Sequence, residues 1–311
     1  MATLASAPPS NAPLTGVRVL DLSRVLAGPY CAMLLGDLGA DVIKVERPVE
    51  GDITRAWGPP FAGGESAYYL CCNRNKRSIA INLATPEGVA LVKRLAAQSD
   101  VVIENFRAGQ LDRYGLSWAT LQAETPALIG CSISGYGRTG PEKDQGGYDV
   151  VIQGTSGFMS ITGEPAGVPM KVGVAVVDLL TALFASNAIL AALYARRNSA
   201  PAERGPIIDM ALMDCALAGL CNVAQSALVT GQAPTRYGNE HPNIVPYQLF
   251  VGADGEYFLV ALGNDAQWPT LCRLIGAPEL AENPAYRTNA LRVQNRMALI
   301  ATLDGIFRMK P

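Results

Sequence analysis

Histidine is almost absent from this sequence: His241 is the only one among 311 residues. A serine hydrolase needs a histidine beside its nucleophile, and catalytic zinc sites usually draw on two or three. Because one residue would have to supply every imidazole, the sequence disfavours both classes of enzyme. We expect an active site without a metal.

Paired cysteine motifs are also missing. The seven cysteines are scattered, and no two of them are spaced as Cys-x-x-Cys. An odd number of dispersed thiols indicates neither a disulfide framework nor a zinc cluster. The pattern is typical of reduced thiols, and it predicts a cytoplasmic protein.

Neither sign of charge is in excess, since 25 lysines and arginines stand against 27 acidic residues. Nucleic-acid-binding domains usually gather basic residues on one face, so we expect no nucleic-acid partner. The N-terminal MATLASAPPSNAPL lacks the basic and apolar regions of a signal peptide. Residues 1–13 are therefore predicted to form a disordered tail.

The longest apolar stretch, KVGVAVVDLLTALFASNAILAAL at 171–193, is interrupted by Asp178 and Asn187. An aspartate near the centre of a bilayer costs roughly 2.5–3.5 kcal/mol on insertion scales. The stretch therefore predicts a helix buried in protein, and no membrane association is expected.

Strand and helix patterns alternate through the first two thirds of the chain. VRVLDL and DVIKVE are apolar strands on either side of the helix-like GPYCAMLLGDLG, and the same alternation continues through 77–83, 86–98, 100–106, 116–125 and 127–137. Buried strands that alternate with helices predict an α/β fold with a doubly wound, Rossmann-like parallel sheet. Glycine is frequent from 137 to 173, which we interpret as loops.

The pattern changes after Gly231. QLFVGADGEYFLVAL at 248–262 is typical of a hairpin around Asp254-Gly255, and helical segments follow. The sequence thus predicts a large domain at 14–231, followed by a linker and a smaller α+β domain at 232–311.

A dinucleotide site of the usual kind is disfavoured. The first turn of the sheet reads SRVLAGP instead of G-x-G-x-x-G, so a pyrophosphate would find no glycine cradle there. The acidic residue that would bind a ribose is Glu46, which is followed at once by Arg47. A nicotinamide-dependent dehydrogenase is therefore not the preferred interpretation.

Asp178 has two interpretations. An aspartate at the start of a helix often caps it by accepting backbone N–H bonds. In an apolar pocket after a glycine-rich segment, the same carboxylate is also a candidate nucleophile. The two roles are compatible, because a helix N-terminus stabilises an anion.

Several motifs together resemble the family III coenzyme A transferases, the CaiB/BaiF type. They are LTGVRVLDLSRVLAGPYCAMLLGDLGADVIKVERP, GDITRAWGPPF, NRNKRSIAINL, VIENFRAGQLDRYGL and SGYGRTGP. The likeness is greatest to the dicarboxylate branch typified by succinate–hydroxymethylglutarate CoA-transferase, through RNKRSIAIN, VPYQLF and TNALRVQNR. The family pattern is an interlocked homodimer.

The resemblance implies that Asp178 is the catalytic nucleophile. Its carboxylate would attack an acyl-CoA donor, succinyl-CoA by the likeness to the dicarboxylate branch, to form a mixed anhydride and then an aspartyl-CoA thioester. An acceptor acid, expected to be dicarboxylic, would take the CoA by the reverse steps. Such covalent catalysis divides one difficult exchange into easier ones.

The resemblance also implies the residues that bind coenzyme A. A lysine of the formyl-CoA branch is replaced here by Gly146, and Lys143 is the nearby candidate to serve in its place. The expected contacts are Leu26, Ala27, Arg47, Ile81, Asn82, Leu83, Ala84, Asn105, Phe106, Arg107, Arg113, Gly146, Gly147, Tyr148 and Asp149.

Two alternative functions remain. The racemase branch, which acts on α-methylacyl-CoA, has a histidine where this chain has Tyr148, and a tyrosine with its ordinary pKa near 10 is a poor base. A non-catalytic acyl-CoA-binding protein is the other alternative. Arg24 and His241 are weaker candidates for the acid-binding site. Family members usually continue beyond FRMKP and return to the large domain, so we expect this return segment to be missing.

Overall fold

The computed structural model describes residues 11–197 and 204–310 and divides the chain into two compact units. The first unit runs to Phe158 and resumes over Lys171–Gln232, and the second comprises Met159–Met170 and the chain from Ala233 onward. This grouping differs from a single boundary at residue 232, because Met159–Met170 joins the second unit. The Arg236 guanidinium explains the difference by donating hydrogen bonds to the carbonyls of Ser160, Glu164 and Gly167. Most of the predicted tail at 1–13 lies outside the described residues.

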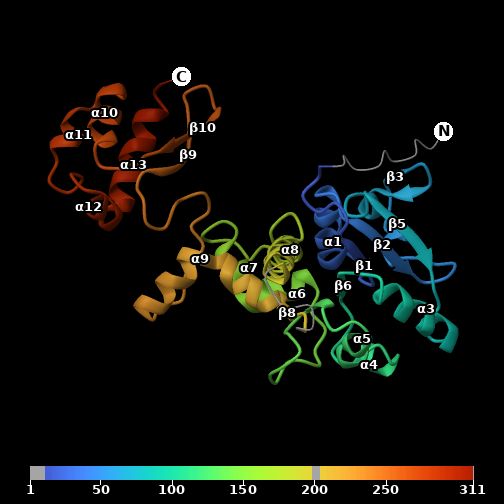
Figure 1. Cartoon of the computed structure of the whole chain (residues 1–311). Helices are drawn as coiled ribbons and strands as arrows, with labels where there is room; N and C mark the ends of the chain where they lie inside the picture. The colour runs from blue at the N-terminus through green and yellow to red at the C-terminus, as the bar shows by residue number, and fades with distance from the viewer. Residues whose placement is uncertain (1–10, 198–203, 311) are drawn as a thin grey trace. The chain divides into compact units, whose positions relative to one another are not determined.

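A six-stranded parallel sheet forms the centre of the first unit (Figure 1). Its order is β5-β2-β1-β6-β7-β8, so the strand order reverses between β1 and β6. In open α/β sheets, ligands bind beyond the carboxyl ends of the strands at such a switch point. The predicted α/β fold with a parallel sheet is confirmed. The strands are β1 (Arg18–Asp21), β2 (Asp41–Glu46), β5 (Lys76–Ala80), β6 (Val101–Glu104), β7 (Ile129–Ser134) and β8 (Ile207–Ala211).

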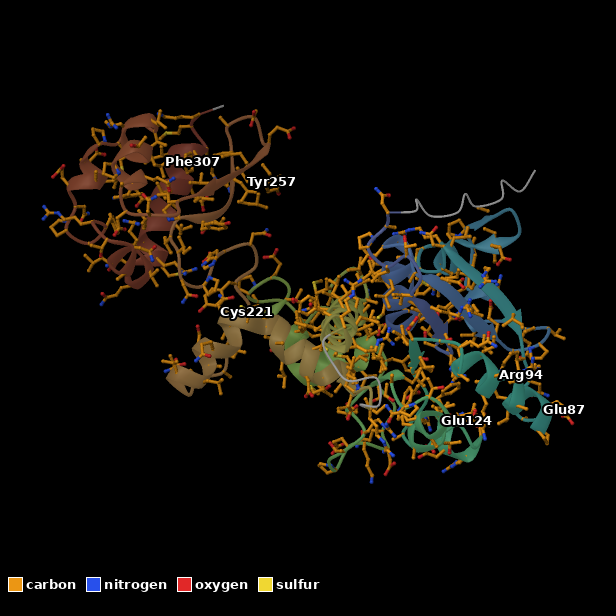
Figure 2. The ribbon with its side chains drawn as sticks, viewed as in Figure 1. Glu87, Arg94, Glu124, Cys221, Tyr257 and Phe307 are labelled. Carbon is orange, nitrogen blue, oxygen red and sulfur yellow. The ribbon has the colours of Figure 1, made fainter. Side chains whose placement is uncertain are left out.

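Both faces of this sheet are covered by helices, which explains why its strands read as continuous apolar runs. Val19 and Ile103 belong to the core beneath α1 (Ala27–Asp37) and α8 (Val176–Arg196). The neighbouring residues Leu20 and Val102 point to the opposite core, beneath α3 (Pro86–Ala96) and α5 (Trp118–Glu124). Figure 2 labels Glu87 and Arg94 on α3, which place an acid in its first turn and a base in its last, as the helix dipole favours.

Short elements complete the connections of the first unit. The chain after β2 forms a 3-10 turn and a small antiparallel pair before it reaches β5, and a short helix precedes α5. These are η1 (Ile53–Ala56), β3 (Phe61–Ala62), β4 (Glu65–Ser66), α2 (Ala67–Leu70) and α4 (Gln110–Arg113).

The interpretation of 137–173 as loops is wrong in part, because α6 (Asp149–Ser156) and α7 (Phe158–Ile161) form there. In α6, Ile152, Gln153 and Ser156 are buried, at the spacing of one helix face. Gly157 follows with φ 99°, the left-handed conformation that commonly ends a helix. In the sequence alone, a glycine that ends a helix cannot be distinguished from a glycine that lies in a loop.

Two helices, α8 and α9 (Leu212–Thr230), are long and apolar enough to cross a membrane by length and composition. The core helix of a globular protein passes the same test, and α8 packs against α1, β7, β8 and α9. α9 is not one straight helix, since Cys221, labelled in Figure 2, has φ 44° and ψ −115°. α8 is thus a core helix of the first unit, as the sequence predicts.

The second unit is built on a hairpin covered by helices. Phe307 contacts Phe250 and Phe258 from the two strands, whereas Tyr257 is exposed; Figure 2 labels Phe307 and Tyr257. The mixture of an antiparallel hairpin and helices is the α+β arrangement expected after residue 232. The elements are β9 (Tyr247–Val251), β10 (Tyr257–Ala261), α10 (Gln267–Leu274), α11 (Glu279–Glu282), α12 (Asn289–Gln294) and α13 (Arg296–Phe307).

One buried arginine holds the loops of the second unit together. The Arg292 guanidinium donates to the carbonyls of Val245 and Tyr286 and to the Asp265 carboxylate, at 2.7, 3.0 and 2.8 Å. Its Cζ also lies 5.3 Å from the centre of the Trp268 ring. Because a buried guanidinium without such partners is costly, these bonds specify how the loops pack.

Gly88→Ala is expected to destabilise the first unit by about 1–3 kcal/mol, the usual cost of overpacking. A Cβ at Gly88 in α3 would lie 1.9 Å from the carbonyl oxygen of Asn82, and backbone cannot rotate away. The matched variant is Gly305→Ala in α13, where an added Cβ meets nothing within 4 Å. That change should be neutral or stabilising by up to about 1 kcal/mol. Urea unfolding followed by circular dichroism measures both, and equal effects would contradict this account.

Candidate active site

A cavity of about 740 Å³ lies at the carboxyl ends of β1, β2, β6 and β7, within the first unit. Arg113 on α4 and Asp149 do not line it, and His241 belongs to the second unit. The cavity lies at the switch point of the sheet and brings most of the predicted site residues together. Those that line it are Arg24, Leu26, Ala27, Arg47, Ile81, Asn82, Leu83, Ala84, Asn105, Phe106, Arg107, Gly146, Gly147, Tyr148 and Asp178.

The turn between β1 and α1 forms one wall of the cavity in a strained conformation. Val25 has φ 72°, which is unfavourable for a β-branched residue. Its N–H group points to the Asp52 carboxylate, at 3.3 and 3.4 Å from the two oxygens. Gly28 lets the helix approach the turn, because a Cβ there would lie 2.3 Å from that of Ser23. The surrounding bonds therefore hold a turn that the chain would not adopt alone.

Lys44 is a lining residue that sequence reasoning missed. It lies in β2 and is almost fully buried, with its Nζ 3.0 Å from the Asp52 carboxylate and 2.8 Å from the Ser23 carbonyl oxygen. Burial lowers the pKa of Lys44, but Asp21 and Asp52 outweigh burial and raise it. A charged lysine thus joins β1, β2 and the Asp52 loop beneath the turn.

Asp21 completes this buried network. Its carboxylate lies 3.0 Å from Nζ of Lys76 and 4.0 Å from that of Lys44, and it accepts a hydrogen bond from the Ser23 hydroxyl. Burial raises the pKa of Asp21, yet Lys76 and Lys44 lower it by more, so the carboxyl group is ionised. The network is charged and internally paired.

Glu46, at the end of β2, is fully occupied by protein. Arg55 donates two hydrogen bonds of 2.8 Å to it, and Ser78, Tyr69 and the Asp52 N–H donate others. Burial raises the pKa of Glu46, but these bonds, led by that from Arg55, lower it to about 2. The acid that would bind a ribose in a dinucleotide fold is therefore engaged elsewhere.

Asn105 binds protein backbone in the cavity wall. Its Oδ1 accepts from the Arg24 N–H at 2.9 Å, and its Nδ2 donates to the Arg24 carbonyl at 2.6 Å. The guanidinium of Arg24 lies over the Phe106 ring, with Cζ 5.6 Å from the centroid. These contacts place the Arg24 side chain at the cavity. Arg24 is one of the two residues named from the sequence as candidates to bind the acid.

Cations gather around this cavity. Arg24, Arg47, Arg107 and Lys143 all line it and are exposed. Arg47 lies 3.5 Å from the Glu50 carboxylate, whereas the other three make no ion pair within residues 11–197 and 204–310. A Cβ at Gly146 would lie 3.6 Å from Nη2 of Arg107, so the guanidinium of this arginine lies close to that glycine. The wall can accept a ligand with several negative charges.

Asp178 is the third residue of α8, and it does not cap that helix. The cap is Asp149: its Oδ1 accepts from the N–H groups of Val177 at 2.8 Å and Asp178 at 3.3 Å. The interpretation of Asp178 as an N-cap is thus corrected, because the Asp149 carboxylate from α6 accepts the N–H bonds at the start of α8. Among the described residues, none donates a hydrogen bond to the Asp178 side chain.

The electrostatics of Asp178 follow from this arrangement. Its side chain is half-buried, and burial, together with the negative charge of Asp149, raises its pKa to about 7. The same two aspartates, after burial, help to raise the pKa of Tyr68 on α2 to about 12. Tyr68 was missed by sequence reasoning, as no motif marks it. Asp178 is therefore a poorly solvated carboxylate, and the Tyr68 phenol, which does not line the cavity, stays protonated at neutral pH.

His241 is held by the second unit. Its Nδ1 accepts from the Asn243 N–H at 3.0 Å, and its ring lies 5.2 Å from that of Tyr247. The Arg296 guanidinium donates to the carbonyls of His241 and Pro242, both at 2.8 Å. No group of three potential metal ligands occurs among the described residues.

Comparison with known proteins gives close relatives. Succinate–glutarate CoA-transferase of Agrobacterium fabrum is 51% identical over 93% of this chain and 73% of its own length. Human succinyl-CoA:glutarate CoA-transferase is 48% identical over 95% of this chain and 66% of its own length. The chain thus spans about two thirds to three quarters of these relatives.

A solved structure and a family model agree with these relatives. The crystal structure of a CaiB/BaiF family protein from Brucella suis matches 97% of this chain and 79% of its own, with 50% identity and a TM-score of 0.82. The model of CoA-transferase family III matches residues 14–311. The resemblance seen in the sequence is confirmed: this chain is a member of CoA-transferase family III.

Proposed function

We propose that this protein transfers coenzyme A from succinyl-CoA to a dicarboxylic acid, with Asp178 as the covalent nucleophile. The observation that carries the proposal is the Asp178 carboxylate itself. It lines the same cavity as most of the predicted coenzyme A contacts, and no described residue donates a hydrogen bond to it. A carboxylate without such bonds keeps its lone pairs available for attack.

The reaction proceeds through two kinds of intermediate on Asp178. A carboxylate oxygen attacks the donor thioester carbon, and the carbon–sulfur bond breaks to give a mixed anhydride and CoA thiolate. The thiolate attacks the Asp178 carbonyl carbon, which releases the donor acid and leaves an aspartyl-CoA thioester. The acceptor carboxylate then attacks this thioester, and the released thiolate attacks the acceptor carbonyl to regenerate Asp178.

The surroundings of Asp178 suit these steps. A half-buried carboxylate is poorly solvated, and limited water protects an anhydride from hydrolysis. Gly146 and Gly147 line the cavity and are candidates to donate backbone N–H bonds to the oxyanions. Asp149 is proposed as the cap of α8, in place of the direct coenzyme A contact expected from the resemblance.

Charge supports the binding of coenzyme A. Arg107 and Lys143 face the cavity without carboxylate partners in the described part of the chain, and Arg47 has only an exposed one. The N-terminus of α1, marked by Leu26 and Ala27, opens on the same cavity and favours negative charge. Arginine binds phosphate through paired, charge-assisted hydrogen bonds.

The names of the relatives support a dicarboxylic acceptor, since both the bacterial and the human enzyme are named for glutarate. Within this chain, Arg24 is the candidate to bind the second carboxylate, because its side chain lines the cavity and its backbone is held by Asn105. A racemase is disfavoured, as Tyr148 lines the cavity where that branch has a histidine.

Compartment and assembly are part of the proposal. All seven cysteines are free, which fits the reduced thiols of a cytoplasmic enzyme. An interlocked homodimer stays a prediction from the family pattern, and the roles of Arg113 and His241 stay predictions as well.

Trapping should place the covalent intermediate on Asp178. The protein is incubated with succinyl-CoA, quenched with hydroxylamine and digested, and peptides are examined by mass spectrometry. We expect a hydroxamate at Asp178, because hydroxylamine attacks the aspartyl carbonyl of the anhydride and of the thioester. Asp178→Asn should give none, whereas Asp112→Asn, at an exposed position outside the cavity, should behave as the parent protein. A hydroxamate at another residue would refute the proposal.

The rate of adduct formation should depend on the ionisation of Asp178. Since the carboxylate is the nucleophile, the rate should fall about tenfold per unit below a pKa of about 7 and level off above it. Stopped-flow release of CoA between about pH 5 and pH 9 measures this profile. A rate that stays constant across this range would contradict ionisation of Asp178 as the controlling step.

The same pKa makes a prediction about stability. The unfolded pKa of an aspartate is about 3.9. When the folded pKa is higher, the free energy of unfolding of the protein falls as pH rises from the unfolded pKa to the folded pKa. Asp178→Asn should therefore raise the melting temperature at about pH 8, and raise it less at about pH 4. Equal effects at the two pH values would show that the folded pKa is not raised.

Arg24→Ala should lower kcat/KM for dicarboxylic acceptors roughly 10–100-fold, the loss expected for a hydrogen bond to a charged group. Monocarboxylic acceptors of similar length should change little, because they lack the second carboxylate. Arg24→Lys keeps the charge and should recover part of the preference. A ratio of dicarboxylate to monocarboxylate activity that is the same in all three proteins would remove Arg24 from the acid site.

A further inference from the structure

Gln153 is a fully buried amide on α6 with hydrogen bonds at both ends. Its Nε2 donates to Oδ2 of Asp149 at 2.6 Å, and its Oε1 accepts from the Val172 N–H at 2.8 Å. A carboxylate only accepts and a backbone N–H only donates, so the chemistry of the two partners determines which way the amide points. Gln153 therefore joins α6 to the segment that leads into α8.

The other carboxylate oxygen of Asp149, Oδ1, continues this connection to the nucleophile Asp178. It accepts from the N–H groups of Val177 and Asp178, so one carboxylate is held between the Gln153 amide and the first turn of α8. The chain of bonds runs from Val172 through Gln153 and Asp149 to the backbone of Asp178. Without the Gln153 donor, only the two N–H groups of α8 would hold the Asp149 carboxylate, and its Oδ2 would have no partner to fix its orientation.

We propose that Gln153 is a positioning residue for Asp178: by holding Asp149 against the N-terminus of α8, it sets the backbone position and the electrostatic surroundings of the nucleophile. This inference rests on the proposed function of Asp178. Gln153 itself does not line the cavity, so it acts through Asp149 and not on the substrate.

Asp149 affects the Asp178 carboxylate in two ways. It occupies N–H donors of the first helical turn that would otherwise favour an anion, and it places a second negative charge nearby. Burial and this charge are the causes that raise the pKa of Asp178 to about 7. A less basic carboxylate would be a weaker nucleophile. The chain of hydrogen bonds from Gln153 through Asp149, which we call the relay, therefore keeps Asp178 reactive.

Other titratable groups near α8 do not account for this effect. Tyr68 on α2 stays protonated at neutral pH. Burial raises the thiol pKa values of Cys31 on α1, Cys131 on β7 and Cys215 on α9, which keeps them neutral. Asp209 on β8 and Asp214 on α9 are not among the causes of the Asp178 shift. The cavity cations Arg24 and Lys143 are exposed.

The test is a direct titration of Asp178 in the ligand-free protein. Carboxyl-carbon NMR of protein labelled at aspartate, with the signal assigned by its loss in Asp178→Asn, gives the pKa without any reaction. Gln153→Leu fills the space but makes no hydrogen bond, and Asp149→Asn keeps an acceptor oxygen but removes the charge. We expect both to lower the Asp178 pKa by about one unit. Thr155→Ala, on the exposed face of the same helix, should leave it unchanged.

The outcomes separate a positioning role from a structural one. If Gln153→Leu lowers the melting temperature while the Asp178 pKa stays at its parent value, Gln153 only packs the core and the proposal is overturned. Should Gln153→Leu not fold, Gln153→Asn keeps the amide but shortens its reach, and the same shift is expected. The acid limb of CoA release should move to lower pH together with the NMR value.

The same experiment distinguishes this inference from the proposed function. A lowered pKa in Gln153→Leu, combined with no hydroxamate at Asp178 in the parent protein, would refute CoA transfer through Asp178 and leave the relay intact. A hydroxamate at Asp178 with an unmoved pKa in Gln153→Leu and Asp149→Asn would support CoA transfer and overturn the relay.

Discussion

The rest of the cavity depends on one interaction, the pairing of the buried Lys44 ammonium group with its acidic and carbonyl partners. An unpaired charge inside a protein is too costly to persist, so Lys44 draws Asp21, Asp52 and the Ser23 carbonyl around itself. These partners come from β1, from the loop after β2 and from the first turn of the sheet. Satisfying one charge therefore fixes three parts of the cavity wall and holds Val25 in its left-handed conformation.

Asp178 is treated in the opposite way. Asp21 and Glu46 are given cations and donors that lower their pKa values, whereas Asp178 is left without a described donor beside a second carboxylate. The paired charges around Lys44 hold the turn after β1. This turn lines the same cavity as Asp178 at the N-terminus of α8. A fold that neutralises its structural charges so thoroughly can keep one carboxylate reactive.

Much of this could be predicted from the sequence, because it depends on local patterns. Apolar runs that alternate with helical segments indicated the parallel sheet, whereas the residues around Leu26, Ile81 and Asn105, which line one cavity, were indicated by the family resemblance. The motif TNALRVQNR was recognised only by resemblance, and the structure gives it a physical meaning. Thr288 caps α12, Asn289 and Arg292 bind the backbone around Val245, and Arg296 binds that of His241. It is a motif that shapes a loop.

The sequence by itself determined that Asp178 is an unusual carboxylate, because a charge within an apolar helix requires a reason wherever that helix lies. Only the tertiary structure decided what surrounds it. Lys44 looked like an ordinary strand residue, α6 was concealed by the glycine that ends it, and Asp149 caps a helix that begins 27 residues later in the chain. Hydrogen bonds between distant segments follow from how the backbone packs, and no local pattern of side chains records them.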